Sequence, residues 1–104
     1  MSRKIPSLVY HVSTKSHFNK FDNVKPYVSE KETIHTITPR KEAIRIANKF
    51  YSSENEVLLL TIRTNKLSNK IEKAEGNCWH IIDSIARETF DVEVLKKNGT
   101  SRFA

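Results

Sequence analysis

The sequence contains few of the residues on which several common kinds of site and membrane anchor depend. One cysteine, Cys78, occurs in 104 residues, so the chain forms no internal disulfide and suits a reducing compartment. Only two glycines occur, Gly76 and Gly99, which excludes the glycine-rich phosphate loops of P-loop and Rossmann proteins. The longest apolar run, residues 57–60, is far shorter than a membrane-spanning segment.

The residues that are present have the composition of an ordinary globular domain. With 38% hydrophobic and 29% charged residues, the chain can form one core and does not resemble a disordered protein. Its first ten residues are basic but lack the apolar stretch of a signal peptide. We therefore expect a single domain over residues 1–104 that is located in the cytoplasm and does not contact a membrane.

The excess positive charge is concentrated in the first half of the chain. The net charge is +6; residues 1–50 hold ten Lys and Arg against four acidic residues, whereas residues 51–104 hold eight of each. A basic surface attracts anions, so we expect a nucleotide or another phosphate-bearing ligand as the partner. Nucleic acid is a weaker alternative, because aromatic residues are not interleaved with the basic ones as in RNA-binding motifs. A purely solubilising role for the charge stays open.

Apolar and polar residues alternate in several short segments, which is typical of strands with one buried face. Residues 56–63 are instead apolar on both faces, which favours a central strand. In the last segment, Phe90, Val92 and Val94 are expected to point inward and the residues between them outward. The expected strands are 7–13, 32–37, 56–63, 70–74, 77–82 and 88–97.

Two helices are expected. Thr38 is a good N-cap and Pro39 suits the first helical position. Apolar residues then recur at three-four spacing over residues 43–50, which predicts a helix with one packed face. A shorter helix is expected after the first strand, capped by Ser13 or Thr14. Because strands and helices do not alternate one for one, we expect a compact α+β domain with a mixed or antiparallel sheet, one main helix and one short helix.

Three of the four histidines, His11, His35 and His80, lie inside expected strands with apolar neighbours. A neutral imidazole donates one hydrogen bond and accepts another, and imidazoles titrate near neutrality, so histidine suits a site for polar ligands. The three side chains can line one pocket, bind zinc together, or be unrelated core residues. Their separations of 24 and 45 residues match no local metal motif, so we expect no metal.

The chain also carries a series of short motifs in a fixed order: Tyr10-His11, Ile34-His35 before Thr38, Asn48-Lys49-Phe50-Tyr51 at a helix end, the apolar stretch 57–62, Ile71-Glu72 and His80-Ile81. This ordered set extends from residue 8 to about residue 96 and resembles the small proteins classified as domain of unknown function 952. The chain departs from that family in two places. Ile37 stands where a small polar residue is usual, and residues 81–84 read Ile-Ile-Asp-Ser instead of Ile-Tyr-Gly-Pro.

The resemblance implies a fold similar to that of ADP-ribosyltransferases, in which a split antiparallel sheet surrounds a cleft for nicotinamide adenine dinucleotide (NAD). It implies that His11 holds a ribose hydroxyl or the nicotinamide amide. It also implies that His35 and His80 orient the phosphates or the acceptor. The expected cofactor is therefore NAD.

Three further residues complete the site that the resemblance implies. With His80, Glu72 is the candidate catalytic residue, which would stabilise the positive ribose or activate an acceptor. Tyr51 or Trp79 would bind the cofactor by stacking on the nicotinamide ring or the base. Each of the three also has an ordinary structural interpretation. Glu72 suits a solvated strand position, Tyr51 the core or its rim, and Trp79 the core.

The expected function is binding of NAD or a related nucleotide and action on its N-glycosidic bond, as an ADP-ribosyltransferase or an NAD glycohydrolase. Two alternatives on the same fold stay open: a non-catalytic nucleotide- or RNA-binding module, and a protein-interaction factor. A nucleic-acid module would bind less tightly as the salt concentration rises. An interaction factor would keep its function when His11 and His80 are replaced by alanine.

Overall fold

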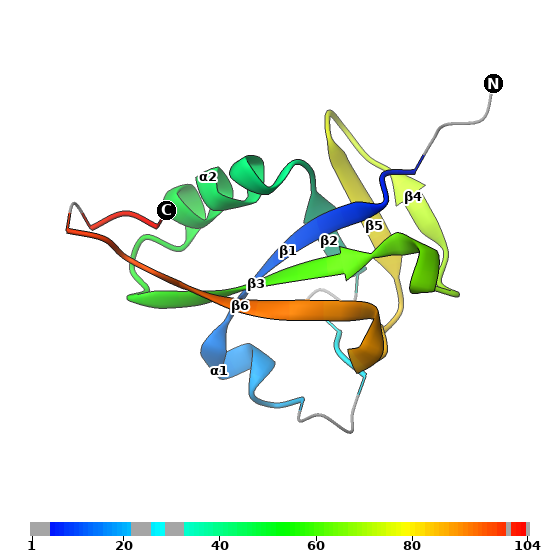
Figure 1. Cartoon of the computed structure of the whole chain (residues 1–104), viewed down its shortest axis with the longest axis horizontal. Helices are drawn as coiled ribbons and strands as arrows, with labels where there is room; N and C mark the ends of the chain where they lie inside the picture. Colours follow the sequence, from blue (N-terminus) through cyan, green and yellow to red (C-terminus); the bar gives the residue numbers. More distant parts are fainter. Residues whose placement is uncertain (1–4, 22–25, 29–32, 100, 104) are drawn as a thin grey trace.

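Six strands pair into one antiparallel sheet in a computed structural model that describes residues 5–21, 26–28, 33–99 and 101–103 (Figure 1). The strands are β1 (Leu8–Thr14), β2 (Thr33–Ile37), β3 (Glu56–Arg63), β4 (Ile71–Lys73), β5 (Cys78–Ile82) and β6 (Phe90–Lys96). Their order across the sheet is β4-β5-β2-β1-β3-β6. The sheet is thus antiparallel rather than mixed, and the similarity to ADP-ribosyltransferases stays a prediction.

The described helices are one main and one short helix, which confirms the predicted α+β class. They are α1 (Lys15–Phe18) and α2 (Arg40–Phe50), with two single 3-10 turns, η1 (Thr64–Lys66) and η2 (Arg87–Thr89). The short helix begins as expected, because the Thr14 hydroxyl oxygen accepts a hydrogen bond from the His17 backbone N–H (3.2 Å). No helix in the described residues is long and apolar enough to cross a membrane.

The sheet consists of two halves that meet at one residue pair. β1 pairs with β3 along its whole length, from Leu8 opposite Arg63 to Thr14 opposite Val57. β2 pairs with β5 in the same complete way. Between β1 and β2, in contrast, the described residues pair only where Tyr10 lies opposite Ile37. This discontinuity in the middle of the sheet determines where the site described below lies.

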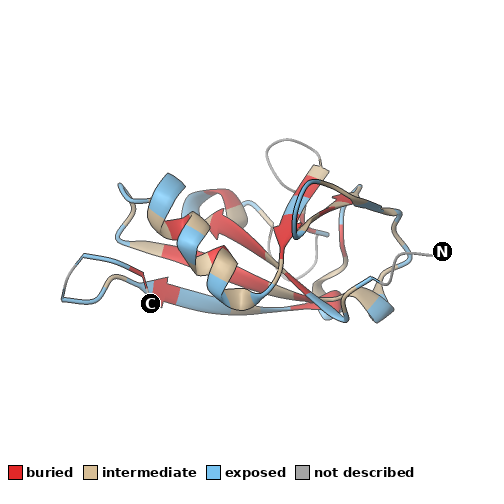
Figure 2. Cartoon of the chain, turned by 90° about the horizontal axis from the view of Figure 1, so that it is seen from above, coloured by how far each residue is buried: buried red, intermediate tan, exposed pale blue. Residues whose placement is uncertain are grey.

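One apolar cluster lies on each face of the sheet. Leu58 and Leu60 of β3 belong to the cluster on the α1 face, whereas Val57 and Leu59 belong to the cluster beneath α2. The two helices lie on opposite sides of the sheet in Figure 1. Buried residues follow the strands and the inner side of α2, while its outer side is exposed (Figure 2). The prediction that residues 56–63 form an inner strand with two buried faces is confirmed.

Helix α2 lies close to the sheet because small residues face it. Ala43 and Ala47 are fully buried against the second cluster. The prediction that Thr38 is the N-cap is wrong, since the helix begins one residue later with Pro39 at that position. Thr38 is held by the sheet instead, because its backbone N–H donates to the Asn77 carbonyl (3.1 Å), just before β5.

The last strand differs from the expected pattern at one position. Phe90 is buried and Val92 packs against the same cluster, as predicted. Val94 is 45% exposed, so the prediction that it points inward is wrong. β6 is an edge strand, and Val94, although opposite Leu58, is not part of the cluster that contains Leu58 and Phe90. At that end of β6, the face of the sheet toward α2 is covered, and Leu95, opposite Val57, is buried on that face.

Candidate functional site

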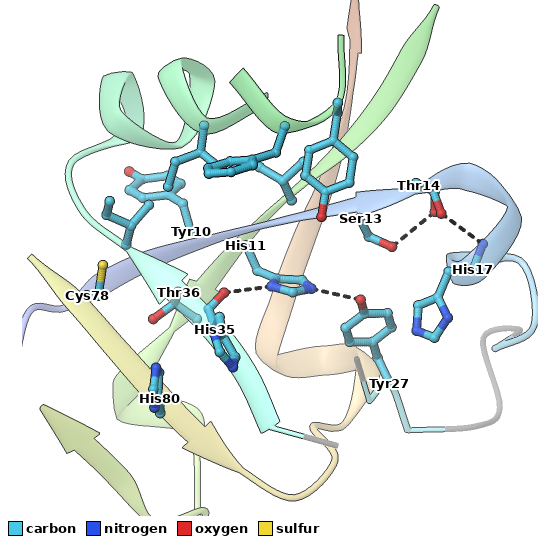
Figure 3. Close-up of a pocket in the computed structure, with 15 residues that line it drawn as sticks. Tyr10, His11, Ser13, Thr14, His17, Tyr27, His35, Thr36, Cys78 and His80 are labelled. Carbon is cyan, nitrogen blue, oxygen red and sulfur yellow. Dashed lines mark hydrogen bonds between the residues drawn. The ribbon is translucent and has the colours of Figure 1, made fainter. Parts of the chain in front are cut away.

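A cleft of about 500 Å³ lies where β1 and β2 part. Its lining includes His11 of β1, His35 of β2, His80 of β5 and Tyr51 at the C-terminal end of α2 (Figure 3). The hypothesis that the three histidines surround one hollow is therefore confirmed. The chemistry available to each of them depends on its surroundings, which differ widely.

His11 is held by hydrogen bonds to the protein at both ring nitrogens. Its Nδ1 lies 2.7 Å from the His35 carbonyl oxygen, and its Nε2 lies 2.8 Å from the Tyr27 hydroxyl (Figure 3). A carbonyl only accepts, so Nδ1 carries the proton, and Nε2 accepts from the tyrosine. Burial, reinforced by the nearby imidazoles of His35 and His17, lowers the pKa of His11 to about 4. His11 is thus a neutral bridge between β1, β2 and the segment that carries Tyr27.

The partner of His11, Tyr27, is itself anchored in the core. Tyr27 is 2% exposed, and its backbone N–H and carbonyl both bond to Ile85 (2.8 Å each). The rings of His17, Phe18, Phe21 and Phe90 surround it, with centroids 5.4–6.2 Å away. Sequence reasoning missed Tyr27 as a cleft residue, because it follows a proline outside any periodic segment. It likewise missed His17, which also lines the cleft and whose Nε2–H donates to the Val28 carbonyl (2.8 Å).

His35 and His80 form a pair across two adjacent strands. Their Cα atoms are register partners, and their ring centroids lie 4.3 Å apart with the ring planes inclined by 33°. His35 is exposed and His80 is half-buried. Figure 3 shows the two rings side by side, away from the bridge formed by His11. These two imidazoles are therefore in contact with each other and accessible to solvent.

The remaining predicted site residues lie outside the cleft lining. Glu72 of β4 is the register partner of His80, so both side chains share one face, but Glu72 is exposed and lies one strand further from the cleft. Its carboxylate is 3.5 Å from the Lys70 ammonium. Trp79 points to the opposite face, where it is 6% exposed and belongs to the core cluster with Ile34. The structure therefore brings together four of the six predicted residues.

The wall of the cleft beside α2 is largely apolar. It is formed by Tyr10, Val12, Ile37, Ile46 and Tyr51. At the rim stands Phe50, which is 68% exposed, with the Lys49 ammonium 5.3 Å from its ring centroid. The spacing over residues 43–50 predicts a packed helix face, and it gave no signal that Phe50 would lie at a cleft. Such a wall suits a flat, aromatic ligand group.

The hydroxyls of Ser13 and Thr36 and the thiol of Cys78 add to the polar lining. The Ser13 hydroxyl donates to the Thr14 carbonyl (3.0 Å), and the Thr36 hydroxyl donates to the Trp79 carbonyl (2.9 Å), so each oxygen retains acceptor lone pairs. The Cys78 thiol is half-buried. No Asp or Glu occurs among the described residues of the lining. In the described part of the chain, no group of three or more His, Cys, Asp or Glu residues is arranged to hold a metal ion.

Comparison with known proteins does not extend these observations. No family model matches the sequence, and no curated protein matches it at a significant level. The resemblance to domain of unknown function 952 therefore stays a prediction from the ordered motifs.

Proposed function

We propose that the cleft binds NAD or a related nucleotide. The observation that carries the proposal is that His11, His35, His80 and Tyr51, from four separate elements, line one hollow with an apolar wall and a polar wall. A volume of about 500 Å³ lies within the range of small-molecule sites. The net charge of +6 favours a ligand that carries phosphate.

The two walls suggest how a nucleotide would be oriented. The flat ring would pack against Tyr10 and Tyr51, with Phe50 closing the rim. The hydroxyl oxygen of Ser13, which retains acceptor capacity, is suited to a ribose hydroxyl. His11 would act chiefly by holding the cleft in shape, because a direct bond from its Nε2 to a ligand requires displacement of the Tyr27 hydroxyl.

The reaction that fits this arrangement is cleavage of the N-glycosidic bond, as in an ADP-ribosyltransferase or an NAD glycohydrolase. Cleavage of that bond develops positive charge on the ribose, and the neutral state of His11 adds no opposing charge. His80, in the lining, would orient the acceptor or a phosphate through its ring. Glu72, on the same face one strand further out, would be a positioning residue that acts through His80.

Ligand-induced stabilisation tests the binding. NAD at one hundred times its Kd should stabilise the fold by about 2.7 kcal/mol, which raises the Tm of a domain of this size by about 10 °C or more. Tyr51→Leu should remove most of this shift, whereas the matched variant Tyr51→Phe keeps the ring and should retain it. Absence of any shift with NAD, ADP-ribose and ATP would contradict the proposal and favour the protein-interaction alternative.

Nicotinamide release from NAD tests the reaction separately. Glu72→Gln should lower kcat by about tenfold and change its pH profile while leaving KM unchanged, because Glu72 does not touch the ligand. Glu75→Gln is the matched control, since Glu75 is an exposed acid in the turn between β4 and β5. Tight NAD binding without nicotinamide release would favour the non-catalytic module.

A second candidate function, nucleic-acid binding, has support on the outer side of α2. Lys41, Arg45 and Lys49 follow one another at intervals of four residues, and all three are exposed. They form a basic stripe that ends beside Phe50 at the rim of the cleft. If this stripe binds single-stranded RNA, affinity should fall steeply with salt. The triple replacement by glutamine should flatten that dependence, and an unchanged slope would exclude the stripe as the binding surface.

A further inference from the structure

We infer that the His35–His80 pair, with its imidazoles protonated, is an anion-binding site for a phosphate of the bound nucleotide. Binding of the nucleotide is then accompanied by proton uptake. The inference rests on the proposed function for the identity of the ligand, but the anion site can be tested without it. The observation that supports the inference is the contact between two accessible imidazoles at the edge of a cleft, with their ring centroids 4.3 Å apart.

The geometry of the pair favours an anion over an uncharged ligand. Two imidazoles in contact can both be neutral, but two positive rings at 4.3 Å repel each other. A negatively charged phosphate beside both rings removes that repulsion and accepts a charge-assisted hydrogen bond from each. Protonation of the pair and anion binding therefore stabilise each other.

The charges around the pair are compatible with this role. In the described part of the chain, the titratable groups facing it from neighbouring elements are Glu72 of β4 with its partner Lys70, Cys78 of β5, Tyr10 and His11 of β1, and Tyr51 at the end of α2. Thiols and phenols are mostly neutral near pH 7. Glu72 lies on the side of His80 away from the cleft, and the Lys70 ammonium is 3.5 Å from its carboxylate.

His11 provides an internal contrast in the same cleft. It is buried, its two nitrogens are occupied by protein groups, and its pKa of about 4 keeps it neutral at physiological pH. His11 should therefore contribute no proton uptake on ligand binding. This assigns the phosphate end of the ligand to the open side of the cleft.

Calorimetry with ADP-ribose at pH 6 and pH 8 tests the inference, because the two phosphates of that ligand keep one charge each over this range. Because imidazoles as a class titrate near pH 6.5, we expect affinity about tenfold higher at pH 6 and proton uptake in buffers of different ionisation enthalpy. Adenosine, which lacks phosphate, should show neither effect. His35→Gln and His80→Gln should each reduce both effects, whereas Lys66→Gln, which removes a positive charge outside the cleft lining, should not.

A second probe separates this inference from the proposed function. Sulfate keeps two negative charges from pH 6 to pH 8, and it should perturb the imidazole NMR signals of His35 and His80 at pH 6 but not at pH 8. If sulfate does so while NAD fails to bind, the anion site stands and the proposed function fails. If NAD binds equally well at both pH values without proton uptake, the anion site is wrong and the proposed function stands.

Discussion

The His11 bridge and the His35–His80 pair lie in the same cleft but in opposite environments. His11 is buried and bonded at both ring nitrogens to the protein, so it is held in one tautomer and stays neutral. His35 is exposed, His80 is half-buried, and their rings touch each other. The same side chain thus serves as a fixed structural bridge in one place and as an accessible polar group a few ångströms away.

This contrast follows from the strand register. Where β1 parts from β2 after Tyr10, the imidazole of His11 bonds to the His35 carbonyl and joins the two strands. On β2 and β5 the pairing is continuous, and it places the His35 and His80 rings beside each other. The break between β1 and β2 therefore makes His11 part of the bonding between the strands, whereas His35 and His80 remain accessible to solvent.

The largest expected effect comes from removal of the bridge. His11→Ala leaves the Tyr27 hydroxyl and the His35 carbonyl without their partner, and each buried polar group left unsatisfied costs about 1–3 kcal/mol. We therefore expect a loss of about 4 kcal/mol in the free energy of unfolding, measured in urea at pH 7. His35→Ala is the matched control and should change it by about 0.5 kcal/mol or less, as for most exposed positions. Equal losses in the two variants would show that the contrast between them is wrong.

The pH dependence of stability sharpens the same contrast. The folded-state pKa of His11, about 4, lies below the ordinary histidine value of 6.5, so between these pH values the unfolded state binds more protons. Stability should therefore fall as pH falls from about 6.5 to about 4, by about 3 kcal/mol, and this contribution should level off below pH 4. Carboxylates titrate near the lower limit too, so the informative quantity is the difference between wild type and His11→Gln. Parallel pH profiles for the two proteins would contradict the assignment of this effect to His11.

Local sequence patterns predicted the elements well and the site only in part. Alternation placed His35 and His80 in strands, but only the order of the sheet makes β2 and β5 neighbours, and that order depends on contacts distant in sequence. No local sequence pattern predicts the bridge between His11 and Tyr27, because Tyr27 lies in a non-periodic segment and contacts β1 through its hydroxyl. The prediction for Val94 was wrong for a related reason. Alternation assigns a residue to one face of the strand, but it does not show how much of that face is covered.

The pattern of apolar residues had a similar limit on α2. The three-four spacing over residues 43–50 predicts burial equally for Ala47 and for Phe50. Ala47 is fully buried, whereas Phe50 is 68% exposed. The difference arises because α2 reaches the rim of the cleft in its last turn, where the cluster beneath it ends. Periodicity assigns residues to one face of a helix, but it does not show how far along the helix that face is covered.

A smaller effect is expected when the bridge is weakened rather than removed. Tyr27→Phe keeps the ring within its aromatic surroundings but removes the hydroxyl that donates to His11. The free energy of unfolding should fall by about 1–2 kcal/mol, less than in His11→Ala, because one hydrogen bond is lost and the His35 carbonyl keeps its donor. In the double variant Tyr27→Phe with His11→Ala the losses should not add, since both changes break the same bridge. Additive losses would mean that the two residues act independently.

The smallest effect on stability is expected at the rim, where binding alone should change. Phe50→Ser removes a ring that is 68% exposed, so the free energy of unfolding should change by about 0.5 kcal/mol or less. Loss of its packing on the nucleotide should weaken NAD binding by about five- to tenfold, which corresponds to about 1 kcal/mol. Val94→Ser is the matched control, because Val94 is also exposed and does not line the cleft. If both variants bind NAD as the wild type does, the rim takes no part in recognition and the ligand lies deeper, between Tyr10 and Tyr51.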